Sequence, residues 1–111
     1  MSNLKDKRCG VCNVGMSSLP SEKSKEYLQS LNGWRQIKNA IEREFTFNSF
    51  GEALKFFNKV AMIAEAEGHH PDMCIHRWKN VKLVFTTYVA SGLTINDFIM
   101  ATKVDELHKE V

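Results

Sequence analysis

The 111-residue sequence has few cysteines, no long apolar run and no large excess of charge of either sign. Its three cysteines are an odd number and too few for the disulfide framework of a small secreted domain. No apolar run approaches the ~18–20 residues of a membrane helix, and residues 1–20 hold no apolar block of signal-peptide length. These absences predict a soluble protein of the cytoplasm that has no membrane partner.

The charges are nearly balanced. Fifteen Lys and Arg against thirteen Asp and Glu give a formal net charge of +2, with His counted as neutral. Basic and acidic residues are interleaved, for example over residues 103–110. Because a nucleic-acid-binding protein normally concentrates basic residues on one face, we expect no direct contact with nucleic acid.

The N-terminal part of the chain contains a C-x-x-C motif, Cys9-Gly-Val-Cys12. This spacing is typical of half a zinc site or of a redox pair. The sequence has no second C-x-x-C, no H-x3–5-H and no strand–helix pattern around the motif. We therefore predict reduced thiols in a flexible extension over residues 1–20, followed by a single domain over 21–111. The 43% of apolar residues is enough to build the core of that domain.

Hydrophobic periodicity predicts three helices and two pairs of strands. The expected order is a helix (21–31), strands (34–38 and 41–47), a long helix (49–67), strands (73–78 and 81–88) and a last helix (94–109). Strand pairs joined by tight turns make antiparallel sheet. The predicted class is α+β, a four-stranded antiparallel sheet with three helices on one face, in the order α-β-β-α-β-β-α. Arg43 interrupts the apolar side of its strand, so we expect it near the sheet edge.

Capping signals mark the ends of the two longer helices. Ser49 with Glu52, and Thr94 with Asp97, have the S/T-x-x-E/D form of a capping box. Gly68 suits the left-handed residue that follows a helix. These signals predict helix starts at 49 and 94 and a helix end close to residue 67.

The long helix has a broad apolar surface. Its main apolar positions are Phe50, Leu54, Phe57, Ala61 and Ala64. Phe56, Val60 and Ile63 widen this face. We therefore expect the helix to contact the sheet on one side and another helix or a subunit on the other.

The densest cluster of candidate chemical groups is Glu65-Ala-Glu67-Gly68-His69-His70-Pro71. Histidine has an ordinary pKa of about 6.5, so both its acid and its base form are accessible near neutrality. Glu65 precedes His69 by four residues, and a regular last turn would place its carboxylate beside an imidazole. Residue 70 precedes a proline and takes extended geometry, so the two rings should point differently. One ring would then meet the reacting atom while the other holds the ligand.

Two other interpretations of the histidines stay open. In one, the pair is simply solvated at a loop. Alternatively, His69, His70, His76 and Glu65 are all possible zinc ligands. Adjacent side chains seldom converge on one ion, however, and no H-x-x-x-H or H-E-x-x-H spacing is present. We therefore expect no metal.

Together these features resemble the pterin-4a-carbinolamine dehydratase family over about residues 21–107. The most specific part is an acidic residue before His-His-Pro, followed at matching spacings by an aromatic residue, a position that is commonly histidine in the family, and an aspartate. These residues are Glu65, His69, His70, Pro71, Trp78, Tyr88 and Asp97. Gly33-Trp34 and Phe45-x-Phe47 also resemble the family pattern.

The resemblance implies a lyase that removes water from 4a-hydroxytetrahydrobiopterin and forms quinonoid dihydrobiopterin, in tetrahydrobiopterin recycling. It implies a pterin substrate, no metal or organic cofactor, and a homodimer or homotetramer. Animal members are also dimerisation cofactors of a homeodomain transcription factor. This leaves a nuclear location open in addition to the cytoplasm, and it makes a non-catalytic interaction protein the alternative function.

The resemblance also assigns roles within the site. His69 is expected to be the principal acid/base group, and His70 to contact the pterin and to be needed for turnover. Glu65 and Asp97 are expected to orient the site, and Trp34 to close one side. The other expected pocket residues are Gly68, Pro71, Thr86, Thr87 and Tyr88.

Some of these residues also have plain structural interpretations. Asp97 is a candidate helix cap, Trp34 a candidate core residue, and the threonines suit a strand. Tyr88 takes the catalytic position where the family commonly has histidine. A phenol is a poor base at pH 7 but can donate a hydrogen bond. We therefore expect dehydration to be retained at a reduced rate.

Overall fold

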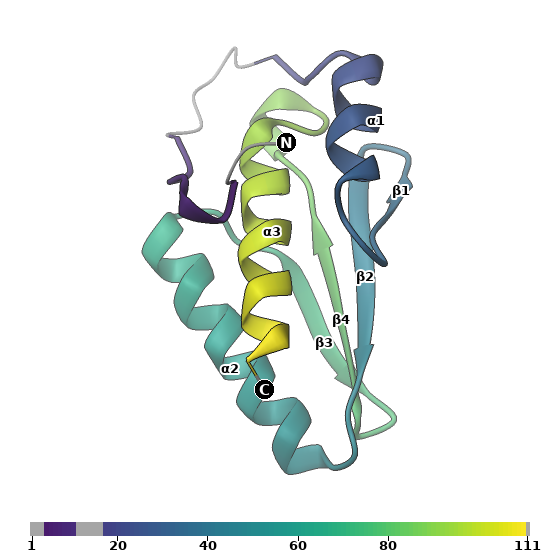
Figure 1. Ribbon diagram of the computed structural model, residues 1–111, viewed down its shortest axis with the longest axis vertical. Coiled ribbons are helices and arrows are strands. Elements are labelled where there is room, and N and C mark those ends of the chain that lie inside the picture. The colour runs from purple at the N-terminus through teal and green to yellow at the C-terminus, as the bar shows by residue number, and fades with distance from the viewer. Residues whose placement is uncertain (1–3, 11–16, 111) are drawn as a thin grey trace.

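The computed structural model describes residues 4–10 and 17–110 (Figure 1). In chain order the elements are η1 (Leu4–Asp6), α1 (Ser21–Gln29), β1 (Arg35–Ile37), β2 (Ala40–Thr46), α2 (Phe50–Glu67), β3 (Asp72–His76), β4 (Asn80–Phe85), η2 (Tyr88–Ala90) and α3 (Ile95–Lys109). The α-helices and strands follow the order predicted from the sequence. The two short 3-10 helices, η1 and η2, were not predicted.

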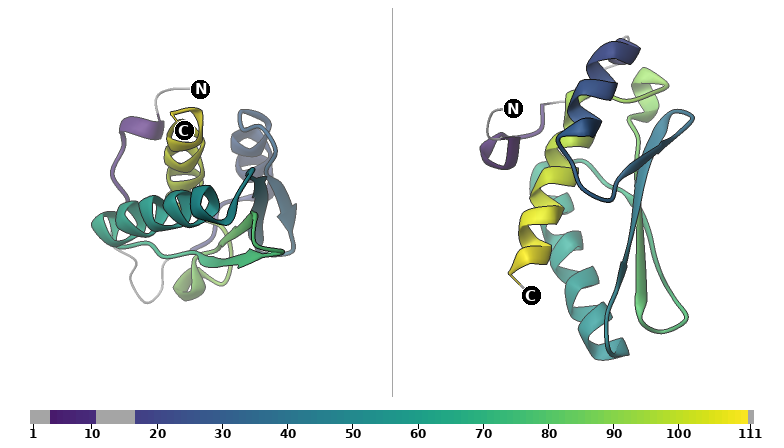
Figure 2. Two further views of the ribbon diagram at one scale, coloured as in Figure 1. Left: turned by 90° about the horizontal axis from the view of Figure 1, so that it is seen from below. Right: turned by 45° about the vertical axis from the view of Figure 1, so that its right-hand side comes forward.

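The four strands form one antiparallel sheet in the order β1-β2-β4-β3. All three α-helices lie on the same face of this sheet (Figure 2). The α+β class and the four-stranded antiparallel sheet with helices on one face are thus confirmed. Within the described residues, none of the helices combines the length and the apolar character that crossing a membrane requires.

The core lies between the sheet and the two longer helices. Phe45 of β2 and Phe85 of β4 face Phe56 of α2 and Phe98 of α3, and all four side chains are almost fully buried. Burying an aromatic side chain of this kind stabilises a domain by about 1.5–3 kcal/mol. These contacts hold the body of α2 and the first turns of α3 against the sheet.

The buried face of α2 differs from the main face that was predicted. Ala53, Phe56 and Val60 point into the core, whereas Phe50 and Leu54 are 51% and 38% exposed. The sequence pattern contains two apolar stripes on neighbouring sides of the helix, and only packing against the sheet selects one of them. Ala64 of the predicted face is buried as well, whereas the part of that face around Phe50 and Leu54 stays on the surface.

Arg43 lies near the sheet edge as expected, because β1 pairs only with residues 40–42 of β2 and leaves Arg43 paired with β4 alone. Its guanidinium lies 2.8 Å from Oδ1 of Asp105 in α3, and it also donates to the backbone carbonyl of Asn32. The indole N–H of Trp34 donates to the same Asp105 oxygen, at 2.8 Å. The arginine is therefore tolerated on the apolar side of its strand because a carboxylate from a helix neutralises it.

The second hairpin also turns at a different place from the one predicted. The turn spans Arg77, Trp78 and Lys79, the first two with φ of +49° and +54°, instead of Lys79-Asn80. Strand β4 ends at Phe85, and a bridge between Thr87 and Gly92 makes the chain leave the sheet there. Tyr88 therefore lies in the short helix η2 and not in a strand.

Residues 4–10 lie against the domain. In Figure 2, η1 and α1 flank α3 on opposite sides. Leu4 is 4% exposed and belongs to the hydrophobic core. Cys12 lies outside the described residues, so the reduced thiol pair and the flexibility of the extension stay predictions.

Candidate active site

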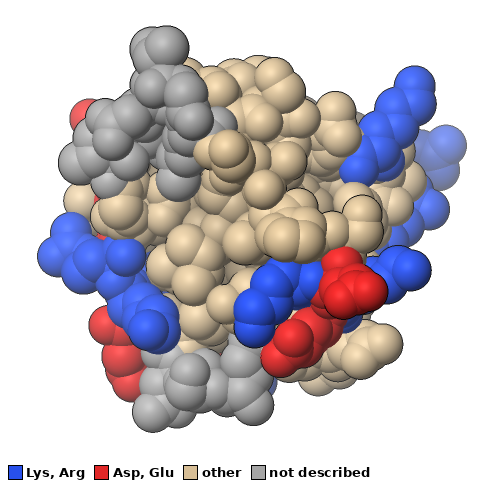
Figure 3. Space-filling view, turned by 90° about the horizontal axis from the view of Figure 1, so that it is seen from above, with Lys and Arg blue, Asp and Glu red and all other residues tan. Residues whose placement is uncertain are grey.

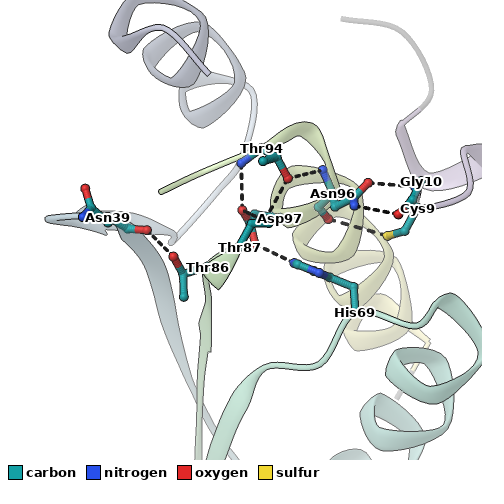
Figure 4. A network of polar contacts seen from close by, with 9 residues as sticks. All are labelled: Cys9, Gly10, Asn39, His69, Thr86, Thr87, Thr94, Asn96 and Asp97. Carbon is teal, nitrogen blue, oxygen red and sulfur yellow. Dashed lines mark hydrogen bonds and ion pairs between the residues drawn. The ribbon is translucent and has the colours of Figure 1, made fainter. Parts of the chain in front are cut away.

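The site is built around a buried pair, His69 and Asp97. Helix α2 ends at Glu67, and Gly68 takes the left-handed conformation (φ 68°) that its lack of a Cβ allows. The chain then turns toward the start of α3, where Nε2 of His69 lies 2.6 Å from Oδ1 of Asp97 (Figure 4). His69 is 6% exposed and Asp97 is fully buried.

Asp97 is held by donors from two further residues. Its Oδ2 accepts the backbone N–H of Thr94 and the hydroxyl of Thr87, both at 2.9 Å. The hydroxyls of Thr87 and Thr94 lie 2.8 Å apart. These bonds include the capping box of α3, so Asp97 is both a helix cap and the partner of His69. Because its carboxylate is fixed in plane and direction, the imidazole that it contacts is fixed as well.

The geometry decides which nitrogen of His69 is left for chemistry. An ionised carboxylate only accepts hydrogen bonds, so Nε2 carries the proton and Nδ1 is the acceptor in the neutral ring. One face of the ring stacks on Phe85, with centroids 6.2 Å apart and an interplanar angle of 11°. His69 is therefore a rigid group with one unshared nitrogen.

Glu65 pairs with His70 and not with His69. Its Oε1 lies 2.8 Å from Nε2 of His70, and both side chains are exposed. The i, i+4 relation to His69 is lost because Gly68 ends the helix and turns His69 inward. As expected, the two rings point differently: one is buried on Asp97 and the other is held at the surface.

A hollow of about 250 Å³ lies beside the pair. Its walls come from the end of α2 and from the segment after β4. They are Gly68, His69, His70, Thr86, Thr87, Tyr88 and Val89. Six of the seven were predicted from the sequence. Val89 was missed because its position depends on η2, for which the sequence has no recognised signal.

The other predicted residues lie outside the walls of this hollow. Asp97 is behind His69, and Glu65 is beside His70. Pro71 follows directly and leads into β3. Trp34 does not close the site: it is a core residue that packs on Phe45 and Phe85 and donates to Asp105.

Tyr88 stands at the rim and is 71% exposed. Its hydroxyl donates to Oδ2 of Asp72 over 3.3 Å. The negative charge of Asp72 and this hydrogen bond raise the pKa of the Tyr88 phenol above its ordinary value. Tyr88 is therefore a protonated hydrogen-bond donor at neutral pH. Sequence reasoning missed Asp72, because its contact with Tyr88 depends on how η2 folds back over β3.

The face of the molecule that is seen from above (Figure 3) carries charges of both signs. The face in Figure 3 shows Lys and Arg side chains around its rim, several of them beside Asp or Glu, and a middle without charged side chains. Among residues 4–10 and 17–110, no group of three His, Cys, Asp or Glu side chains is placed to hold a metal ion.

Comparisons with known proteins identify relatives of this chain. Residues 17–107 match the family described as "Pterin 4 alpha carbinolamine dehydratase". A protein of Alkaliphilus metalliredigens named putative pterin-4-alpha-carbinolamine dehydratase is 41% identical, over 99% of this chain and all of that one. The mitochondrial pterin-4-alpha-carbinolamine dehydratase 2 of Arabidopsis thaliana is 37% identical over 99% of this chain, which spans 62% of that protein.

Two solved structures share the fold. The transcriptional coactivator/pterin dehydratase from Brucella melitensis superimposes with a TM-score of 0.77 at 30% identity, over 82% of this chain and 98% of that one. A pterin dehydratase-like RuBisCO assembly factor of the alpha-carboxysome has a TM-score of 0.58 at 23% identity, over 68% and 89%, and shows likeness of fold alone. From the matched residues and these relatives, the chain belongs to the pterin-4a-carbinolamine dehydratase family.

Proposed function

We propose that this protein removes water from 4a-hydroxytetrahydrobiopterin to give quinonoid dihydrobiopterin, in tetrahydrobiopterin recycling. The observation that carries the proposal is the buried His69–Asp97 pair at the edge of a hollow that His70 and Tyr88 also line. A carboxylate behind an imidazole stabilises the charged ring that forms when it takes a proton.

The reaction needs two proton transfers. The C4a–O bond breaks and a C4a=N5 double bond forms, so the oxygen must gain a proton and N5 must lose one. The lone pair on N5 pushes the oxygen out, and the proposal therefore requires no metal or organic cofactor. His69 Nδ1 is the principal acid/base atom, because Nε2 is occupied by Asp97.

The exposed residues of the site bind the pterin. His70, oriented by Glu65, contacts the ring system and assists turnover. Thr86, Gly68 and Val89 shape the hollow. Tyr88 donates a hydrogen bond but does not accept a proton readily, so the proton transfers depend mainly on the histidines. We therefore expect slower dehydration than with a histidine at position 88.

A stopped-flow assay of 4a-hydroxypterin loss tests the proposal. The parent should accelerate dehydration, and His69→Ala should be slower by ~10²–10⁴-fold, which is the usual contribution of general acid–base catalysis. Tyr88→His should be faster than the parent. His76→Ala is the matched control, because His76 pairs with Glu44 on the sheet and lies outside the hollow. Equal rates for the parent and His69→Ala would contradict the assignment.

A second candidate, an interaction protein, is supported by the exposed apolar stripe of α2. Phe50, Leu54 and Met62 are on the surface of this helix, and a solved relative is named both coactivator and dehydratase.

The same stripe supports a homodimer or homotetramer. Size-exclusion chromatography with light scattering should find an oligomer at micromolar concentration. Leu54→Asp should shift it toward monomer, whereas Lys25→Asp, at an exposed position of α1, should not. A pure interaction role requires that pterin neither binds nor is dehydrated.

A further inference from the structure

Residues 4–10, here called the N-terminal strap, run along α3 to the end of α2 (Figures 1 and 2). At the start of the strap, Leu4 is buried in the core. The ammonium of Lys103 in α3 donates to the backbone carbonyl of Lys5 at 2.7 Å. The strap is thus anchored to the middle of α3, some distance from the histidine pair.

The other end of the strap is attached to Glu67, the last residue of α2. Oε1 of Glu67 accepts the backbone N–H of Cys9 at 2.8 Å, and Oε2 lies 2.7 Å from Nε of Arg8. Arg8 also donates to the backbone carbonyl of Ala66. Glu67 is two residues before His69, so these contacts hold the end of the helix that delivers the histidine.

The strap is also attached to Asn96, the residue before Asp97. The backbone N–H of Gly10 donates to Oδ1 of Asn96, and Nδ2 of Asn96 donates back to the Gly10 carbonyl, both at 2.9 Å (Figure 4). The Cys9 thiol points at the Asn96 carbonyl, with sulfur and oxygen 3.8 Å apart. Asn96 is 1% exposed. These contacts hold the first turn of α3, from which Asp97 projects.

We propose that the N-terminal strap positions the catalytic pair by tying the end of α2 to the start of α3. His69 and Asp97 come from these two different helix ends, and ends are where helices fray. Their 2.6 Å contact therefore depends on a link between the ends. Asn96 and Glu67 are positioning residues in this scheme and do not touch the substrate. The inference rests on the proposed dehydratase function, since its consequence is a faster reaction.

Position 10 allows a matched test. A Cβ added at Gly10 would meet no atom within 4 Å, so Gly10→Ala keeps the backbone contacts without a clash. Gly10→Pro removes the N–H that donates to Asn96. We expect Gly10→Pro to lower kcat about tenfold with KM within about twofold of the parent, because a misplaced catalytic group costs rate more than binding. Gly10→Ala should match the parent.

Amide hydrogen exchange of the ligand-free protein supplies a readout that does not depend on activity. The N–H of His69 bonds to the Ala64 carbonyl, and that of Asp97 to the Thr94 carbonyl. Both amides should exchange about tenfold faster in Gly10→Pro than in Gly10→Ala, while amides in the middle of α2 should be unchanged.

The outcomes separate the two proposals. Equal exchange rates in the two variants would overturn the proposal that the strap holds the ends of α2 and α3. Faster exchange with an unchanged kcat would overturn its role in catalysis. If the parent shows no dehydration while the exchange difference is present, the proposed function fails and the positioning of the pair stands.

Discussion

Nε2 of His69 lies 2.6 Å from Oδ1 of Asp97, although 28 positions separate the two residues in the chain. The carboxylate that stands behind the imidazole is also the cap of α3. A group needed to complete a helix start is therefore used a second time, to hold a histidine. This double use ties the chemistry of the site to the stability of the fold.

The charge of Asp97 should matter more than its shape. Asp97→Asn keeps an oxygen for the cap but removes the negative charge behind His69, so we expect the dehydration rate to fall by ~10²–10⁴-fold. Stopped-flow kinetics measures this loss. Glu44→Gln, which removes a carboxylate on the sheet outside the hollow, serves as the control. A fall of less than threefold for Asp97→Asn would contradict a role for the pair.

The Thr87 hydroxyl should contribute to the stability of the folded state. Thr87→Val leaves a side chain of the same shape but removes the bonds to Asp97 and Thr94. Buried acceptors and donors then lack a partner, and the free energy of unfolding in urea should fall by about 1–3 kcal/mol. Thr86→Val, at a more exposed position, should cost less. Equal losses in the two variants would mean that the buried network contributes no more to stability than the hydrogen bond of Thr86.

Tyr88 should titrate above an ordinary tyrosine because of Asp72. Asp72→Asn removes the negative charge and should lower the pKa of Tyr88 toward its ordinary value of about 10. Ultraviolet absorbance of the phenolate follows the titration, and Tyr88→Phe assigns the transition. Glu44→Gln, elsewhere on the sheet, is the control. An unchanged pKa in Asp72→Asn would show that the contact does not form in solution.

Glu67 should make the protein sensitive to acid. Burial raises the pKa of its carboxyl, but hydrogen bonds from Cys9 and Arg8 and the charge of Lys103 together hold the pKa below 4.5. The ionised group therefore stabilises the folded state above that pH, and this stability is lost as the pH falls through the lowered pKa. Urea unfolding at pH 7 and pH 3 should show a smaller difference for Glu67→Gln than for the parent. Glu26→Gln, on the exposed surface of α1, should behave as the parent does.

Local chemistry explains why most of the fold was predictable. The ends of α2 and α3 follow from Ser49, Gly68 and Thr94, whose capping roles depend only on neighbours a few residues away. The alternation of β2 and β4 likewise shows in the sequence. The hairpin turn at Arg77 and Trp78 was missed because neither residue is a usual turn former at positive φ.

The histidine pair and most of the walls of the hollow could be recognised from residue types and their spacing in the chain. Which carboxylate pairs with which histidine could not be recognised in this way. Glu65 is near His69 in sequence yet binds His70, while His69 binds Asp97 from another helix, because the left-handed turn at Gly68 sets the direction of each ring. The strap contacts at Asn96 arise in the same way. Periodicity and capping act over a few residues and are written in the chain, whereas contacts between distant segments exist only once the core has packed them together.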